Sequence, residues 1–136
     1  MRLAAVVVAL LIHPALAADE IAAFDRAFKR YKAMDYYGFC TALGPAVRKK
    51  PQGPAERAAR DVAALHYGVP PGDFGPIESR DLKIGMSMCA VIASQGRPTE
   101  VREHASRLGQ SWSVWYRERR TLIYVGNDQR VTRFSR

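Results

Sequence analysis

The two cysteines and two of the three histidines, His66 and His104, are the residues whose side chains could react with a substrate. Cys40 and Cys89 are the only cysteines among the 136 residues. A Cys–His dyad using His66 or His104 would generate a thiolate nucleophile, but it requires an orienting partner and a pocket that the sequence does not indicate. The two histidines fall on different predicted elements without an acidic ligand at the short spacing typical of zinc sites. We therefore predict no catalytic residue, no metal and no cofactor, and a protein that is not an enzyme.

A second group of residues is suited to binding. Trp112 and Trp115 have opposite parity along a predicted strand, so both can reach one core only if a bulge intervenes. One of them is therefore a candidate for an exposed anchor, since Trp, Tyr and Arg are favoured at binding hot spots. The alternative for the aromatic residues is that they only fill the core. The alternative for the arginines is that they form a solvated turn. The predicted contact surface consists of Trp112, Trp115, Tyr116, Arg117, Arg119 and Arg120.

Residues 1–18 have the composition of a cleaved secretory signal peptide. Arg2 gives a positive start, Leu3–Ile12 is apolar, and Ala15-Leu16-Ala17 is an A-x-A cleavage pattern. Such an apolar run is too short to cross about 30 Å of hydrocarbon, and a buried core helix is the alternative. We predict a mature protein that is soluble and periplasmic or secreted. We expect no membrane span, because no later stretch is long and apolar enough, and no lipid anchor, because no cysteine follows the cleavage pattern.

Export bears directly on the two cysteines. In an oxidising compartment Cys40 and Cys89, both on predicted apolar helix faces, most simply form a disulfide bond with each other. Closing a loop of about fifty residues would stabilise the protein by roughly 4 kcal/mol on the chain-entropy estimate. Two free buried thiols are the alternative.

The rest of the chain divides into a helical region with a Pro/Gly-rich connector, 19–78, and a second region, 79–136. Apolar residues spaced by three and four predict a helix over 19–33, opened by Asp19-Glu20, a short helix ending near Gly44-Pro45, and a third through His66. Three prolines and three glycines predict a loop over 67–76. The residues predicted on the apolar helix faces are Ile21, Phe24, Phe28, Tyr31, Tyr36, Phe39, Cys40, Leu43, Ala58, Val62 and Leu65.

The second region predicts a short helix followed by strands. Ser87 is placed to cap that helix, and Gly96-Arg97-Pro98 to end it. Strands are predicted over 99–106, 112–116 and 121–125, with a fourth over 131–134 as an open alternative. The predicted fold class is α+β: N-terminal helices, a short helix, and a three- or four-stranded antiparallel meander with helices over one face.

This second region resembles a known domain family. The residues that carry the resemblance are Ile84-Gly85-Met86-Ser87, Val91, Gly96, Pro98, Trp115-Tyr116, Ile123-Tyr124-Val125-Gly126 and Val131. Together they look like the SmpA/OmlA (BamE-like) domain, over about residues 82–136. The resemblance implies helices followed by a three-stranded antiparallel sheet, and non-enzymatic protein–protein contact at the bacterial envelope. The best-known members are lipoproteins of the outer-membrane assembly machinery, and the fold is also similar to secreted proteins that inhibit β-lactamases.

Charge restricts the partners. The chain has 21 Lys and Arg against 13 Asp and Glu, a formal net charge of +8. A basic exported protein meets acidic protein faces, cell-wall polymers and anionic lipid head groups. The sequence has neither a phosphate-binding glycine loop nor the interleaved aromatic and basic residues of RNA binding, so we predict no nucleic-acid partner.

These observations favour a periplasmic, non-enzymatic interaction module that binds an envelope protein. One alternative is an inhibitor of an exported enzyme, in which the charged turn Arg117–Arg120 fills an acidic cleft. The other is a basic protein that binds cell-wall polymers or lipid.

Overall fold

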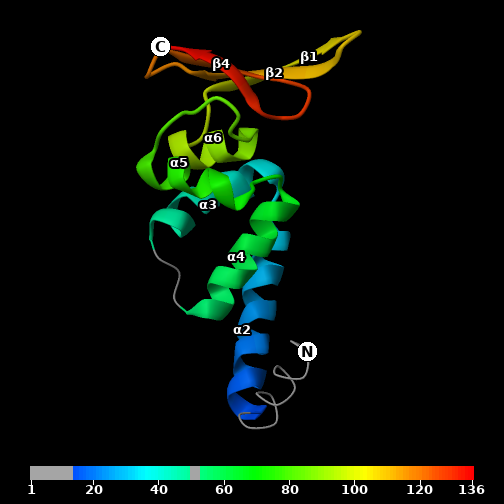
Figure 1. Cartoon of the computed structure of the whole chain (residues 1–136), viewed down its shortest axis with the longest axis vertical. Helices are drawn as coiled ribbons and strands as arrows, with labels where there is room; N and C mark the ends of the chain where they lie inside the picture. The colour runs from blue at the N-terminus through cyan, green and yellow to red at the C-terminus, as the bar shows by residue number, and fades with distance from the viewer. Residues whose placement is uncertain (1–13, 50–52) are drawn as a thin grey trace.

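A computed structural model describes residues 14–49 and 53–136 of the chain. The predicted α+β fold class is confirmed, because the helices come first and a four-stranded antiparallel sheet comes last (Figure 1). Most of the predicted signal peptide lies outside the described residues, and residues 14–18 form the first turn of helix α2. Within the described part of the chain, no helix has both the length and the apolar character needed to cross a bilayer.

The first three helices are α2 (Pro14–Lys32), α3 (Tyr36–Arg48) and α4 (Pro54–His66). Helices α2 and α4 lie side by side and project away from the sheet; we call this pair the arm (Figure 1). They run in the same direction. The start of α4 lies beside Glu20, and just past the other ends the Tyr67 hydroxyl donates a 2.7 Å hydrogen bond to the Met34 carbonyl.

Two helix boundaries differ from the prediction. Helix α2 begins at Pro14 rather than at Asp19, and α3 continues through Pro45 to Arg48. Proline removes one helical hydrogen bond, yet the Lys49 amide still donates to the Pro45 carbonyl at 2.7 Å. Arg48 fixes this last turn, because its Nη1 donates to the carbonyls of Ile77 and Ala93 at 3.3 and 3.1 Å.

The face of α4 that is buried also differs from the prediction. Val62 and Leu65, expected in the core, are 45% and 58% exposed, and Ala58 is exposed as well. The buried residues are Ala59, Arg60, Ala63 and Ala64. Small alanines let the backbones of α2 and α4 approach closely. Arg60 can be buried because its Nη1 donates to the Ala46 carbonyl at 3.2 Å and its Nη2 lies 2.8 Å from Asp61.

The segment predicted as a loop over 67–76 contains helical turns. A 3₁₀ turn, η1 (Pro71–Asp73), leads into α5 (Phe74–Ser79). Pro70 precedes η1 as its N-cap, while Pro71 begins η1 and Pro76 lies in the first turn of α5, where a helix needs no amide donor. The Asp73 carboxylate accepts a 3.0 Å hydrogen bond from the Ser87 amide, and Ile77 is fully buried. Tertiary contacts therefore order a segment whose composition is typical of a loop.

Helix α6 (Met88–Gln95) forms the centre of the core. The predicted caps are confirmed: the Ser87 side chain accepts from the Ala90 amide at 3.2 Å, and Gly96, with φ of 88°, ends the helix. The predicted disulfide is also confirmed, because Cys40 of α3 and Cys89 of α6 are joined by an S–S bond of 2.07 Å. The disulfide thus links α3 and α6 within one buried core, to which both the helical region and the sheet contribute side chains.

The sheet is the predicted meander with the fourth strand present. Its strands, in spatial order, are β1 (Glu100–Ser106), β2 (Gly109–Tyr116), β3 (Thr121–Val125) and β4 (Val131–Ser135). Alternate residues of the central strands are buried on the side of α6, as expected when helices cover one face. Among the described residues, the helices lie on that side only (Figure 1).

Candidate interaction surface

The two tryptophans of β2 lie on opposite faces of the sheet, as their parity predicts. Trp112 shares the core face with Val114 and packs against the buried cluster. Trp115 is half-buried on the other face, where its cross-strand neighbours are Glu100 of β1 and Leu122 of β3. Trp115 is therefore the tryptophan that faces away from the helices. The sequence alone predicted that one tryptophan faces away from the core but did not show which one.

Tyr116 belongs to the core rather than to the surface. Its side chain is 6% exposed, and its hydroxyl donates a 2.8 Å hydrogen bond to the Gly96 carbonyl at the end of α6. Burial raises the pKa of the Tyr116 hydroxyl, which therefore stays neutral and remains a donor. Of the six residues predicted to make contact, Trp112 and Tyr116 thus lie on the core side.

The three predicted arginines lie in the exposed turn between β2 and β3. Arg119 Nη1 donates to Gln95 Oε1 at the end of α6, and the Arg117 amide donates to Thr99 Oγ1 at 3.0 Å. Arg120 has a positive φ of 50°, which closes the turn. The turn is therefore anchored at both sides, and the Arg119 guanidinium is held at the junction of α6 and the sheet.

A shallow hollow beside this turn brings in one further arginine. The hollow has a volume of about 200 Å³, and Arg97 lines it together with Arg117 and Arg119. The pattern Gly96-Arg97-Pro98 predicts the end of a helix and does not identify Arg97 as a surface residue. This helix end places Arg97 next to the β2–β3 turn, because Tyr116 is hydrogen-bonded to the neighbouring Gly96. The arginines form a cluster that adjoins the sheet.

The side of the sheet that faces away from α6, which we call the outer face, has an apolar centre and a charged rim. Trp115, Leu122 and Tyr124 are half-buried at its centre. The Arg133 guanidinium lies 4.0 Å from the centroid of the Tyr124 ring, a cation–π contact. The alternation of the strands places these residues on the outer face: Glu100, Arg102, His104, Ser111, Ser113, Trp115, Leu122, Tyr124, Arg133 and Ser135.

The histidines considered above have structural contacts. His104 Nε2 and Ser113 Oγ are 2.8 Å apart across β1 and β2. His66 ends α4, and its ring lies edge-on to Tyr67 with 5.2 Å between centroids. Both cysteines are in the disulfide, so neither is a thiol that could pair with these rings.

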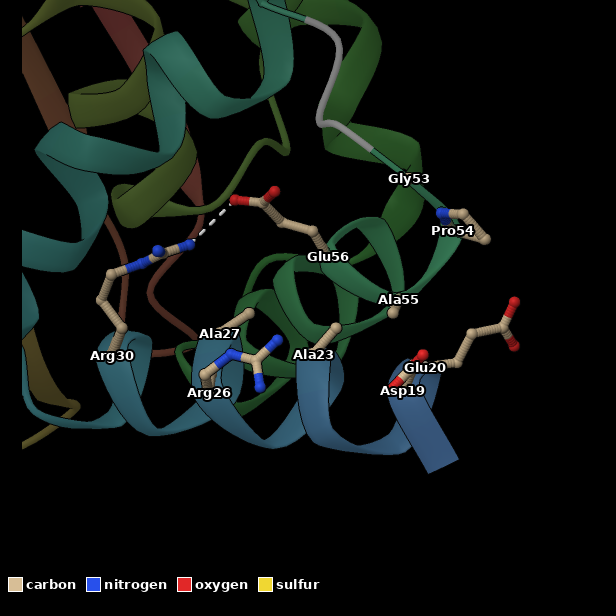
Figure 2. Close-up of a pocket in the computed structure, with 10 residues that line it drawn as sticks. All are labelled: Asp19, Glu20, Ala23, Arg26, Ala27, Arg30, Gly53, Pro54, Ala55 and Glu56. Carbon is tan, nitrogen blue, oxygen red and sulfur yellow. Dashed lines mark hydrogen bonds and ion pairs between the residues drawn. The ribbon is translucent and has the colours of Figure 1, made fainter. Parts of the chain in front are cut away.

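A second hollow lies in the arm and was not foreseen from the sequence. It has a volume of about 380 Å³ between residues 19–30 of α2 and the first turn of α4, and it is lined by both acidic and basic residues (Figure 2). The Arg30 guanidinium reaches across it to Glu56, with 2.8 Å between Nη2 and Oε1. Asp19, Glu20 and Arg26 complete its charged lining. Because opposite charges face the same space, this hollow does not select a ligand of one sign.

Comparisons of this chain with protein-family models, with curated proteins and with solved structures found no match. The resemblance to the SmpA/OmlA domain therefore stays a prediction from the motif residues.

Proposed function

We propose that this protein is an exported, non-enzymatic interaction module that binds an acidic surface of a bacterial envelope protein. The observation that carries the proposal is the position of Trp115. It lies on the outer face, away from the helices, and the anchored turn with Arg117, Arg119 and Arg120 follows it directly. Tryptophan and arginine are the residues that most often dominate binding energy at protein interfaces.

The outer face has the anatomy of a binding site. Large amphipathic side chains occupy its centre, and charged residues surround them, as in protein–protein interfaces. The arginine turn and Arg97 add positive charge beside the sheet at the end of α6, where Glu118 lines the same hollow. Such a field speeds association with an acidic partner and disfavours basic ones. The rigid sheet holds the anchor residues, so little side-chain freedom is lost on binding.

Two features support export. The first residues have the composition of a signal peptide. The buried disulfide between α3 and α6 is of the kind that persists in oxidising compartments and is rare in the reducing cytosol.

An affinity pull-down from a detergent-solubilised bacterial envelope tests the proposal. Washing at about 0.3 M salt shortens the screening length below about 8 Å and removes diffuse electrostatic contacts. We expect one dominant envelope protein, identified by mass spectrometry, to be retained by the native chain. Trp115→Ala should lose it, whereas Ile84→Ala, at a 62% exposed apolar residue outside the outer face, should retain it. Equal retention by both variants contradicts the proposal.

The anchored turn also favours a second function, inhibition of an exported enzyme. A charged tip held by Gln95 of α6 and by Thr99, just before β1, is suited to fill an acidic cleft. Stoichiometric loss of an envelope enzyme's activity, relieved by Arg117→Ala with Arg119→Ala, would select this function. Binding to cell-wall polymer or lipid that disappears with salt would instead select a purely electrostatic ligand.

A further inference from the structure

The arm exposes apolar side chains that its own two helices do not bury. Ile21 of α2 is 58% exposed, and Val62 and Leu65 of α4 are 45% and 58% exposed. Phe24 and Phe28 are only partly buried and stack on each other with 5.7 Å between their centroids. These residues carry the helical periodicity of the sequence, yet the contact between the helices uses alanines.

Helix geometry places these side chains on one side of the arm. Ala27 of α2 and Ala59 of α4 are buried and mark the line along which the two helices meet. At about 100° per residue, Phe24 and Phe28 lie to one side of that line on α2. Because the two helices are parallel, Val62 of α4 lies on the same side of the arm. The Arg30–Glu56 ion pair spans the opposite side (Figure 2). We call Ile21, Phe24, Phe28, Ala58, Val62 and Leu65 the arm face.

We propose that the arm face is the interface of a homodimer, in which the arms of two copies pack antiparallel as a four-helix bundle. A pair of helices is a single layer, and its apolar side is buried only when a second layer packs on it. A second copy supplies the same apolar side, and a twofold axis makes the contact self-complementary. This dimer is independent of the function proposed for the outer face.

The size of the arm face fits a reversible dimer. Helix α4 has 13 residues, and α2 retains residues 19–32 after the predicted cleavage, so the layer is about 20 Å long and, with helices about 10 Å apart, roughly 20 Å wide. It therefore offers roughly 400 Å² per copy, and a dimer would bury about 800 Å² in total, a size found in weak, reversible contacts. We expect a dissociation constant in the micromolar range.

The charges of α2 favour a second copy over a lipid surface. Asp19, Glu20, Arg26 and Arg30 line the hollow on the opposite side of the arm. Outside that hollow, α2 carries the acidic residue Asp25 first and the basic residues Lys29 and Lys32 in its last turns, and the Lys32 ammonium lies 5.0 Å from the centroid of the Phe28 ring of the arm face. Antiparallel arms place the acidic part of one copy beside the basic part of the other. Parallel arms would place like charges together. An anionic membrane would attract only the basic part and repel the acidic one.

Sedimentation velocity of the full chain, purified with its disulfide intact, tests the dimer. Between about 1 and about 200 µM, a range that brackets micromolar dissociation constants, the mass should rise from one copy to two. Leu65→Glu should raise the dissociation constant at least about tenfold, since the charge would be buried twice in the interface. Val62→Glu should act in the same way. Ile84→Glu, at a 62% exposed residue outside the arm, is the matched control and should leave the constant unchanged.

Three results would overturn the dimer. One is a native chain that stays a single copy at every concentration. Another is an equal effect of Leu65→Glu and Ile84→Glu while circular dichroism shows all variants folded. The third is a native chain that stays a single copy and floats with phosphatidylglycerol vesicles, whereas the Leu65→Glu variant does not float. The arm face would then contact lipid. Trp115→Ala should not alter the dimer, which keeps this test separate from that of the outer face.

Discussion

The backbone of Gly44 in α3 lies directly against the carbonyl oxygen of Ala93 in α6. A Cβ at residue 44 would collide with this oxygen and would come within 2.9 Å of Arg48 Nη2. The oxygen belongs to the backbone of a buried helix, so it cannot rotate away as a side chain could. The disulfide Cys40–Cys89 joins the same two helices. Close approach at Gly44 therefore determines how α3 packs on α6.

Replacing Gly44 with alanine should force α3 and α6 apart. We expect Gly44→Ala to lower the free energy of unfolding by about 1–3 kcal/mol, the usual cost of overpacking a core. Urea denaturation followed by circular dichroism measures it. Gly72→Ala is the control, because a Cβ there meets nothing within 4 Å and the backbone is not left-handed. Equal stability of the two variants would show that the helices adjust freely.

Arg60 connects the arm to the rest of the molecule through a buried guanidinium. Its side chain is 9% exposed, and it binds the Ala46 carbonyl, the Asp61 carboxylate and the face of the Phe74 ring. Arg60→Ala should lower the free energy of unfolding by about 2–3 kcal/mol, because packing is lost and the Ala46 carbonyl loses its donor. Thermal unfolding measures the change. Arg57→Ala, at an exposed residue of the same helix, should have little effect.

The sheet and the caps of α6 could be predicted because their signals are local. Ser87 and Gly96 act within one helical turn, and β3 alternates buried and half-buried residues along its length. The disulfide followed from having two cysteines on apolar faces. The parity of Trp112 and Trp115 predicted opposite faces, but which face is buried depends on where α6 packs, and no local pattern contains that information.

The arm was harder to predict because periodicity identifies an apolar side without identifying its partner. Val62 and Leu65 have the spacing of a buried face, but α4 meets α2 through Ala59 and Ala63. The charge of Arg60 disfavours burial, yet its side chain is only 9% exposed. The Ala46 carbonyl and Asp61 stabilise that charge, and Ala46 belongs to a different helix. Contacts between elements, rather than local preferences, decided both cases.

The disulfide gives a prediction about both reactivity and stability. Cys40 and Cys89 are at most 1% exposed, so the native, unreduced protein should show no reactive thiol. Two thiols should react only after reduction and unfolding. Cys40→Ala with Cys89→Ala should lower the free energy of unfolding by about 2–5 kcal/mol, as for other native disulfides in small domains. Reductant should not destabilise this double variant further. Two reactive thiols in the native sample would contradict the bond.

Tyr36 makes stability sensitive to alkaline pH. Burial, with a smaller contribution from the neighbouring Tyr37, raises the pKa of Tyr36 from 10.0 to about 12. The unfolded chain therefore releases this proton at lower pH than the folded chain does. The stabilisation is complete below pH 10 and is lost as the pH rises through about 12. By pH 11 this single group should have lowered the free energy of unfolding by about 1 kcal/mol.

Tyr36→Phe isolates that contribution, because phenylalanine fills the same space without an ionisable hydroxyl. Urea unfolding at pH 9 and pH 11 should show a smaller alkaline loss of stability in this variant than in the native chain. Tyr116→Phe should also reduce the loss, since burial raises the pKa of that hydroxyl too. Unlike Tyr36→Phe, it should lower stability already at pH 9, because it removes the hydrogen bond to Gly96. An alkaline loss that neither variant reduces would mean that groups other than these buried phenols cause it.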